Sequence, residues 1–245
     1  MNLAKPATDP DPRAVRQHQG RPRWKPSPAL ISLALSLILF SALVENLLAR
    51  GWWFALDSRV LALMEKLTRP AGATVYPYVN AINAMGGRLA IIALMVFMAA
   101  YLCFRRQWRH LFIFAVVYGS GEGVMLILKA IYHRARPPAP LIQVQGSGFP
   151  SGNAFTAMLF CGLLIYLIGA QATGKGLRWA YTAVGGFLVL AVGFNRLYLR
   201  AHWLSDVLAG YLAGFAWLLV VIILVQALWP VRETPAPPLN SPPEG

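Results

Sequence analysis

The chain has 245 residues, of which 57% are hydrophobic and only 13% are charged, and this balance argues against a soluble globular protein. Its 22 Lys and Arg residues give a formal net charge of +13, but they fall mostly in short clusters between long apolar stretches. That distribution argues against a nucleic-acid-binding domain. We therefore expect the lipid bilayer, and no nucleic acid, as the partner of this chain.

Six apolar stretches are long enough to cross the hydrocarbon core of a bilayer, which requires about 20 residues of helix. They cover residues 28–48, 87–104, 110–129, 154–172, 179–195 and 206–229. Residues 53–84, between the first two stretches, mix Trp and Leu with charged side chains and predict an amphipathic helix on the membrane surface. We therefore expect an all-α integral membrane protein, with six transmembrane helices and an amphipathic interfacial helix between spans one and two.

The expected six-span domain covers residues 28–229 and lies between two polar tails. Residues 1–27 and 230–245 are rich in proline and have the composition of disordered segments. Basic residues cluster in the first tail and in the connections near 105–109 and 175–178, which the positive-inside rule assigns to the cytoplasm. This predicts a multi-pass protein of the cytoplasmic (inner) membrane, with both termini cytoplasmic and the connection between spans three and four facing the periplasm or exterior.

Basic residues also occur at the outward ends of spans three to six, where the positive-inside rule does not place them. They belong to three short blocks of sequence. The blocks are Lys129-x6-Arg136-Pro137, Phe149-Pro150-Ser151-Gly152-Asn153 and Arg196-x5-His202-x3-Asp206. Basic residues that oppose the topological bias need another reason, and an anionic ligand supplies one.

The residue types in these blocks suit a phosphoryl group. Lys129, Arg136 and Arg196 supply charge-assisted donors, and the forked guanidinium groups match the spacing of phosphate oxygens. Ser151 and the backbone N–H groups near Gly152 lie at the N-terminus of the fourth span, where the helix dipole favours an anion. The sequence therefore predicts a phosphate site at the outward ends of spans three to six.

His202 and Asp206 add a nucleophile to this site. They are four residues apart, so at the start of a helix they share a face and the carboxylate can hold one ring nitrogen. The other nitrogen is then free to attack phosphorus. A single cation or histidine at the end of a span is more often an anchor or a structural residue. Three spaced blocks on one side of the membrane favour a site instead.

The three blocks resemble the motifs of the type-2 phosphatidic acid phosphatase superfamily, which read K-x6-R-P, P-S-G-H and S-R-x5-H-x3-D. The resemblance runs from Lys129 to Asp206, and the six spans indicate the membrane lipid phosphatase branch. It implies that His202 is a nucleophile that becomes a phosphohistidine, with Asp206 as its orienting partner. It implies no metal or other cofactor. The phosphate cradle that it implies consists of Lys129, Arg136, Ser151, Gly152 and Arg196.

Two positions depart from the family's motifs, since Asn195 replaces a serine and Asn153 replaces a histidine. In the family that histidine is the general acid that protonates the leaving oxygen, and an asparagine has no proton to give up near neutral pH. Three explanations stay open. They are an introduced His-to-Asn exchange, a natural enzyme for lipid diphosphates, whose phosphate leaving group needs less help, and a natural protein that binds lipid phosphates without catalysis.

The expected function is therefore hydrolysis of a lipid phosphate or diphosphate through a phosphohistidine, impaired by Asn153. The substrates that the resemblance implies are polyprenyl diphosphates such as undecaprenyl diphosphate, phosphatidylglycerol phosphate, phosphatidic acid and lipid A phosphate. A lipid phosphotransferase and a noncatalytic lipid-phosphate-binding protein are the alternatives.

Other polar and small residues within the spans carry further expectations. Glu122, seven residues before Lys129, is either a partner behind the site or a carboxylate hydrogen-bonded inside the bundle. Arg134, in the spacer of the first block, either lines the entrance of the site or meets the headgroups, and the second position is favoured. Gly210 and Gly214 share a face with Asp206, which predicts that the last span packs closely against the bundle. The same close packing is expected in span three, at Gly119, Gly121 and Gly123.

Overall fold

The structure, a computed structural model, describes residues 27–69, 88–169 and 174–229. The two predicted tails, apart from Ser27, and the second part of the predicted amphipathic segment lie outside these residues. The described residues form helices joined by short connections and one longer loop. The helices are α2 (Pro28–Leu48), α3 (Trp52–Thr68), α5 (Arg88–Phe104), α6 (Trp108–Tyr132), α7 (Gly152–Gly169), α8 (Lys175–Tyr198) and α9 (Leu204–Leu228).

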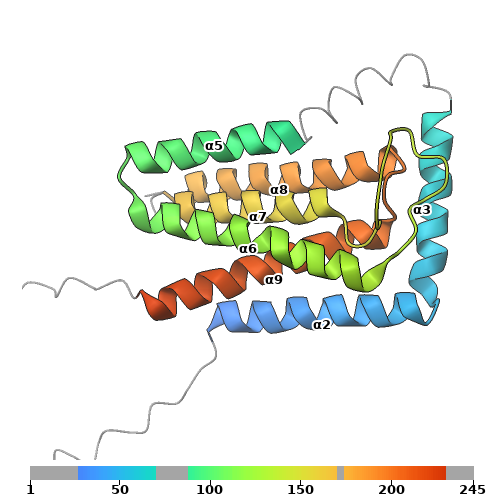
Figure 1. Ribbon diagram of the computed structural model, residues 1–245, viewed down its shortest axis with the longest axis horizontal. Coiled ribbons are helices and arrows are strands. Elements are labelled where there is room, and N and C mark those ends of the chain that lie inside the picture. Colours follow the sequence, from blue (N-terminus) through green and yellow to red (C-terminus); the bar gives the residue numbers. More distant parts are fainter. Residues whose placement is uncertain (1–26, 70–87, 170–173, 230–245) are drawn as a thin grey trace, which may run out of the picture.

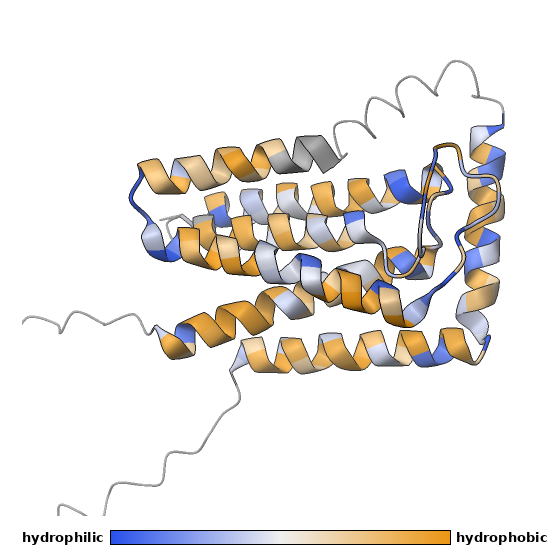
Figure 2. Cartoon of the chain, in the orientation of Figure 1, coloured by the Kyte–Doolittle hydropathy of each residue, from blue (hydrophilic) through white to orange (hydrophobic). Residues whose placement is uncertain are grey.

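Each predicted span coincides with a helix of the structure. By length and hydropathy, α2, α6, α8 and α9 qualify as membrane spans, while the described apolar parts of α5 and α7 are shorter than that criterion. The hydrophobic colour predominates over these helices in Figure 2, as is typical of helices that lie in lipid. The all-helical fold is therefore confirmed, and four of the described helices have the length and composition of membrane spans. The six crossings and the interfacial position of the amphipathic helix stay predictions.

The apolar helices run roughly along one axis, and α3 crosses this axis at one end (Figure 1). The loop of residues 133–151 and the connection from α8 to α9 lie at that same end, which is called the α3 end below. The basic connection of residues 105–107 and the start of α8 lie at the opposite end. The second and third sequence blocks are thereby brought together with the end of α6, although they are far apart in the chain.

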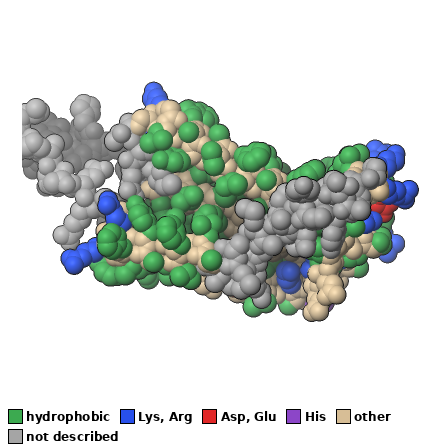
Figure 3. Space-filling model, turned by 90° about the horizontal axis from the view of Figure 1, so that it is seen from above, with side chains coloured by type: hydrophobic (Ala, Val, Ile, Leu, Met, Phe, Trp, Pro, Cys, Tyr) green, Lys and Arg blue, Asp and Glu red, His purple; other side chains and the backbone are tan. Residues whose placement is uncertain are grey.

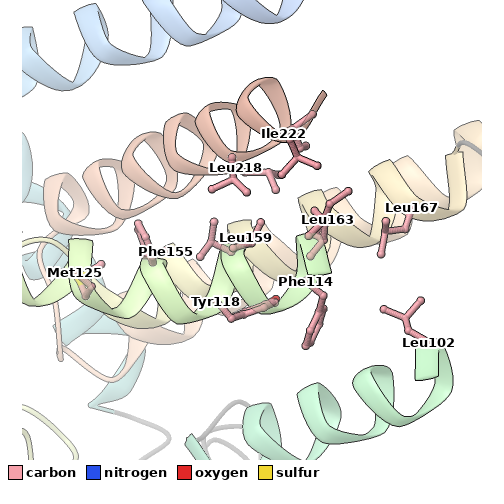
Figure 4. Packing of buried hydrophobic residues seen from close by; sticks show 14 residues of the cluster. Leu102, Phe114, Tyr118, Met125, Phe155, Leu159, Leu163, Leu167, Leu218 and Ile222 are labelled. Atoms are coloured by element: carbon pink, nitrogen blue, oxygen red, sulfur yellow. The ribbon is translucent and has the colours of Figure 1, made fainter. Parts of the chain in front are cut away.

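The hydrophobic core lies between α6, α7 and α9 (Figure 4). Phe155, Leu159 and Leu163 of α7 pack between Val117 of α6 and Leu218 of α9, and each of these side chains is at most 3% exposed. Large hydrophobic side chains on the outer faces of the helices remain exposed in the protein. Figure 3 shows such side chains over the middle of one face, with Lys and Arg mainly toward the two ends, which is the surface expected of a protein that bilayer lipid surrounds.

Glycines allow α9 to approach α7 at the α3 end. A Cβ atom at Gly210 would lie 2.6 Å from the carbonyl oxygen of Ser151, and one at Gly214 would lie 2.8 Å from that of Phe155. These distances confirm the predicted close packing of the last span. The expectation for span three holds for Gly121, whose added Cβ would meet Leu159 at 2.9 Å. It is wrong for Gly119 and Gly123, which have open space around them.

We expect Gly210→Ala to destabilise the protein by about 1 to 3 kcal/mol, the usual cost of overpacking. The new methyl group must push α9 away from the backbone of Ser151, which a rotamer change cannot avoid. Thermal unfolding of the purified protein in detergent measures the effect. Gly123→Ala is the matched control, because its methyl group enters open space and leaves the unfolding temperature unchanged or raises it. Equal unfolding temperatures for the two variants would contradict the packing described here.

Candidate phosphate site

His202 lies in the connection between α8 and α9 and is only 7% exposed. Its Nδ1 atom lies 2.8 Å from the carbonyl oxygen of Gly148, and its Nε2 atom lies 3.1 Å from Nη1 of Arg136. A carbonyl oxygen only accepts a hydrogen bond and a guanidinium only donates. Nδ1 therefore carries the proton, and Nε2 presents its lone pair toward the cation.

Arg136 is held by backbone carbonyl groups. Its Nη1 donates to the carbonyl oxygen of Ala201 at 2.9 Å, and its Nε donates to that of Gly146 at 3.1 Å. Its Nη2 donates to the carbonyl oxygens of Gln145 at 3.0 Å and Ser147 at 3.3 Å. These bonds orient the guanidinium without neutralising its charge, because each acceptor is a neutral dipole. The guanidinium therefore keeps its positive charge at the site, while its five N–H donors are engaged by these carbonyl groups and by Nε2 of His202.

The other two predicted cations lie near Arg136. Lys129 of α6 places its Nζ atom 3.5 Å from the carbonyl oxygen of Ser147, which Arg136 also contacts. Arg196, near the end of α8, is 6% exposed and donates a hydrogen bond to the side chain of Asn195. The charges of Arg196 and Arg136 are close enough to repel each other. Holding like charges together in this way favours the binding of an anion between them.

The start of α7 supplies the second sequence block, with Gly152 as the first helical residue. The hydroxyl group of Ser151 is fully buried and has no hydrogen-bond partner among the described residues, so it is an unused donor. A Cβ atom at Gly152 would lie 4.0 Å from Nζ of Lys129, which places that cation beside the helix start. Asn153 is half-buried at the next position. This helix start therefore combines the features that bind a phosphate oxygen.

The Asp206 carboxylate lies beside the ring nitrogen of His202 that it was predicted to hold, but a backbone carbonyl group is the nearer partner of that nitrogen. The nearest oxygen of Asp206 lies 3.6 Å from Nδ1, whose hydrogen bond goes to Gly148. One carboxylate oxygen accepts from Arg134 at 2.6 Å and the other from the backbone N–H of Trp203 at 2.9 Å. The helix α9 begins after His202, so the regular four-residue spacing on which the prediction relied does not apply. Asp206 is therefore a second and longer contact of Nδ1, beside the carbonyl oxygen of Gly148.

This region also contains two charged residues, Arg134 and Asp57, for which the sequence favours another position. For Arg134, the sequence favours contact with the headgroups over a place at the entrance of the site, but its guanidinium bridges Asp206 at 2.6 Å and Asp57 at 2.7 Å. Asp57, expected on a surface helix, is 2% exposed. The spacing within the first block placed Arg134 beside the site, but no pattern in the sequence marked Asp57. By contrast, Glu122 is exposed on α6 about 10 Å along the helix from Lys129 and is not among these contacts.

Burial lowers the pKa of His202 below its ordinary value of 6.5. The charge of Arg136 lowers the pKa as well, whereas Asp206 and the carbonyl oxygen of Gly148 act in the opposite direction. The lowered pKa agrees with the hydrogen bonds, which require an unprotonated Nε2. At neutral pH the imidazole is therefore uncharged, as a nucleophile must be.

We expect His202 to titrate below pH 6.5 in the folded protein. The unfolded chain takes up this proton near the ordinary value, so the residue favours folding above pH 6.5 and this contribution is lost as the pH falls toward the lowered value. Carbon-13 NMR of protein with labelled histidine measures the midpoint, and the resonance is assigned by its loss in His202→Gln. A midpoint at or above 6.5 would contradict the burial and the cation contact.

These groups form one cluster at the α3 end, and their charges and donors suit a tetrahedral anion. A nucleophilic nitrogen faces a guanidinium, two further cations lie nearby, and an unused hydroxyl donor lies at a helix N-terminus. Among the described residues, no group of three or more His, Cys, Asp or Glu side chains is placed to hold a metal ion.

Comparison with known proteins agrees with this geometry. The PAP2 superfamily model matches residues 110–230, which include all three sequence blocks. Phosphatidylglycerophosphatase B of Bacillus subtilis is 27% identical over 158 residues, which cover 61% of this chain and 77% of that protein.

Two crystal structures share the fold. That of a transmembrane PAP2 type phosphatidylglycerolphosphate phosphatase from Bacillus subtilis has a TM-score of 0.65 and 23% identity, and the match covers 83% of this chain and 98% of that one. That of Aquifex aeolicus LpxE has a TM-score of 0.52 and 18% identity, covering 66% and 94%. The described helices, the three sequence blocks and the family match lead to one conclusion: through residues 110–230, this membrane protein belongs to the PAP2, or type-2 phosphatidic acid phosphatase, superfamily.

Proposed function

We propose that this protein is a membrane lipid phosphatase in which Nε2 of His202 attacks a lipid-linked phosphoryl group. The observation that carries the proposal is the pair of contacts of His202, with Nδ1–H donating to Gly148 and Nε2 facing Arg136. They supply a neutral imidazole whose Nε2 lone pair accepts a hydrogen bond from the cation that would hold the phosphate, so a bound phosphate would have to replace that contact before attack. The similarity to phosphatidylglycerophosphatase B of Bacillus subtilis supports the same conclusion.

The proposed reaction has two steps. In the first, the lone pair of Nε2 of His202 forms a bond to phosphorus while the bond from phosphorus to the lipid oxygen breaks, and that oxygen keeps the electron pair. In the second, water attacks phosphorus, the bond to Nε2 breaks, and inorganic phosphate leaves. Lys129, Arg136 and Arg196 would stabilise the negative charge on the phosphoryl oxygens, with the hydroxyl group of Ser151 as a further donor.

The substrate is proposed to be a lipid phosphomonoester or diphosphate that keeps its tails in the bilayer. An apolar groove between α2 and α6 leads to Arg134 at the edge of the site, and its walls supply a surface for a lipid tail. The groove is lined by Val44, Leu47, Leu48, Tyr132, Arg134 and Phe149. Phosphatidylglycerol phosphate is the first substrate to test because of the similarity to phosphatidylglycerophosphatase B, and undecaprenyl diphosphate is the second.

We also propose that the site faces the periplasm or exterior of the cytoplasmic membrane. The basic connection of residues 105–107 and the start of α8 lie at the end of the bundle opposite the site. The positive-inside rule assigns that end to the cytoplasm. The α3 end, with its phosphate-binding residues, then lies on the other side.

A second candidate, a noncatalytic lipid-phosphate-binding protein, is favoured by Asn153, which cannot act as a general acid. The test is release of inorganic phosphate from phosphatidylglycerol phosphate and undecaprenyl diphosphate by the purified protein in detergent micelles, together with analysis of the lipids. Free phosphate supports the phosphatase, and phosphate transferred to a second lipid supports a phosphotransferase. Lipid binding without release, by this chain and by Asn153→His, would support the binding protein and overturn the proposed activity.

A further inference from the structure

Helix α3 brings a buried carboxylate to the edge of the phosphate site. Asp57 lies outside residues 110–230, which the superfamily model matches, and in none of the three sequence blocks. Its Oδ1 atom accepts a hydrogen bond from the backbone N–H of Ser205 at 2.9 Å. Its Oδ2 atom accepts from the hydroxyl group of Ser205 at 2.5 Å and from Nη2 of Arg134 at 2.7 Å. A carboxylate from α3 thus binds a free N–H group in the first turn of α9, where the helix dipole favours a negative charge.

Arg134 connects this carboxylate to the site. Its Nη1 atom donates to Oδ1 of Asp206 at 2.6 Å and to the hydroxyl oxygen of Ser205 at 2.7 Å. The guanidinium also lies over the ring of Trp203, 5.5 Å from the ring centroid. One planar cation therefore bridges two buried carboxylates, one from α3 and one from α9, and fixes their separation.

The far end of this chain of contacts is His202. The second oxygen of Asp206 lies 3.6 Å from Nδ1 of His202, and Asp57 and His202 line the same small cavity. The trio of Asp57, Arg134 and Asp206 carries a net charge of −1 when all three are ionised. Without Asp57, the charges of Arg134 and Asp206 would cancel.

That net charge matters because the imidazole becomes positive when Nε2 attacks phosphorus while Nδ1 keeps its proton. Resting on the proposed function above, we propose that Asp57 is a positioning residue of the reaction. Through Arg134 and the start of α9 it holds Asp206 beside His202, and its charge stabilises the positive imidazole ring that forms in the attack. The residue acts through others and does not touch the substrate.

The test is Asp57→Asn, which keeps the size of the side chain and removes its charge. We expect kcat to fall roughly 10- to 100-fold, as for the outer partners of metal-ligating histidines, while KM stays unchanged because the phosphate-binding cations are intact. The NMR titration midpoint of His202 is expected to move to lower pH, because the positive ring loses a nearby anion. In Asp57→Asn, the charged groups that remain around His202 are Asp206 on α9 and two arginines of the loop, Arg134 and Arg136.

Two further variants separate this role from ordinary packing. Leu163→Ala removes a buried side chain from the core between α6, α7 and α9, and Leu163 does not line the small cavity that His202 lines, so this variant lowers the unfolding temperature without changing the titration midpoint. Asp57→Glu keeps the charge and moves it by one methylene, so it retains the midpoint while kcat falls at unchanged KM. Where Asp57→Asn does not yield folded protein, Asp57→Glu carries the test.

The inference is overturned if Asp57→Asn leaves both kcat and the midpoint of His202 unchanged, or if Leu163→Ala moves the midpoint equally. A wild-type kcat in Asp57→Glu overturns it when only that variant folds. The midpoint is measured without turnover, so this result is separate from the proposed function. If the unmodified chain and Asn153→His release no phosphate, the proposed function fails, whatever the titration shows.

Discussion

Replacing Asn153 with histidine is expected to raise the rate of phosphate release from a lipid phosphomonoester by about 10² to 10⁴, the usual contribution of a general acid. The residue is half-buried at the second position of α7, beside the glycine that lies next to Lys129. An imidazolium there can protonate the departing lipid oxygen, which an asparagine amide cannot do. The new side chain thus supplies the proton that the alkoxide leaving group requires.

The measurement is release of inorganic phosphate from phosphatidylglycerol phosphate and from undecaprenyl diphosphate. The rate of release from the diphosphate should rise much less. Its leaving group is a phosphate, whose second ionisation lies near pH ~6, so it departs without needing a proton from the histidine. Asn153→Gln is the control, since it changes the size of the side chain without adding an acidic proton, and it should give no gain. Equal gains for both lipids would show that the histidine acts through binding and not through protonation.

Replacing His202 with glutamine is expected to lower phosphate release by roughly 10⁴ to 10⁶, in line with the loss of other catalytic nucleophiles and their bases. Glutamine keeps a polar group near Gly148 but has no nitrogen lone pair able to attack phosphorus. The cations Lys129, Arg136 and Arg196 remain, so the lipid should still bind. The variant therefore separates binding from chemistry.

Two measurements check this expectation. One is phosphate release, and the other is acid-labile labelling of the protein by a lipid with radioactive phosphorus, which His202→Gln should abolish. His133→Gln is the matched control, because His133 is exposed at the end of α6 and should leave both signals intact. A rate in His202→Gln close to that of the unchanged protein would exclude His202 as the nucleophile.

The sequence predicted the helices well because lipid imposes a simple requirement on them. An apolar run of about 20 residues is a helix wherever it is buried in a bilayer, so the starts of α2 and α9 were placed within two residues of the structure. The close approach of α9 to α7 was equally visible, since Gly210 and Gly214 share one helix face. These features depend on local composition and spacing, which the sequence states directly.

The contacts of the site were predictable only in part. The three blocks identified Arg136 and His202, which the structure places 3.1 Å apart. The partner of Nδ1 was missed because it is a backbone carbonyl group, that of Gly148, and a backbone atom has no signature in the sequence. Which acceptor a ring nitrogen uses depends on where the loop of residues 133–151 runs.

Asp57 and Arg134 were misplaced for a different reason. A charged residue near the end of a span or in an amphipathic segment is exposed unless an opposite charge from elsewhere in the chain meets it. The two lie 77 positions apart, and no periodicity links them. Glu122 shows the reverse error, because a carboxylate within a span was expected to face inward, and it is exposed on α6.

The hydrogen bonds between Asp57 and Ser205 join α3, which is translated early, to α9, the last helix that the structure describes. During translation, Asp57 and Arg134 exist before Ser205, Asp206 and His202 have been synthesised. A nascent chain that ends before α9 lacks Ser205 and Asp206, which are two of the partners of Arg134. On the proposed function, activity arises only when α9 has joined the bundle, and a product truncated before α9 has no phosphatase activity.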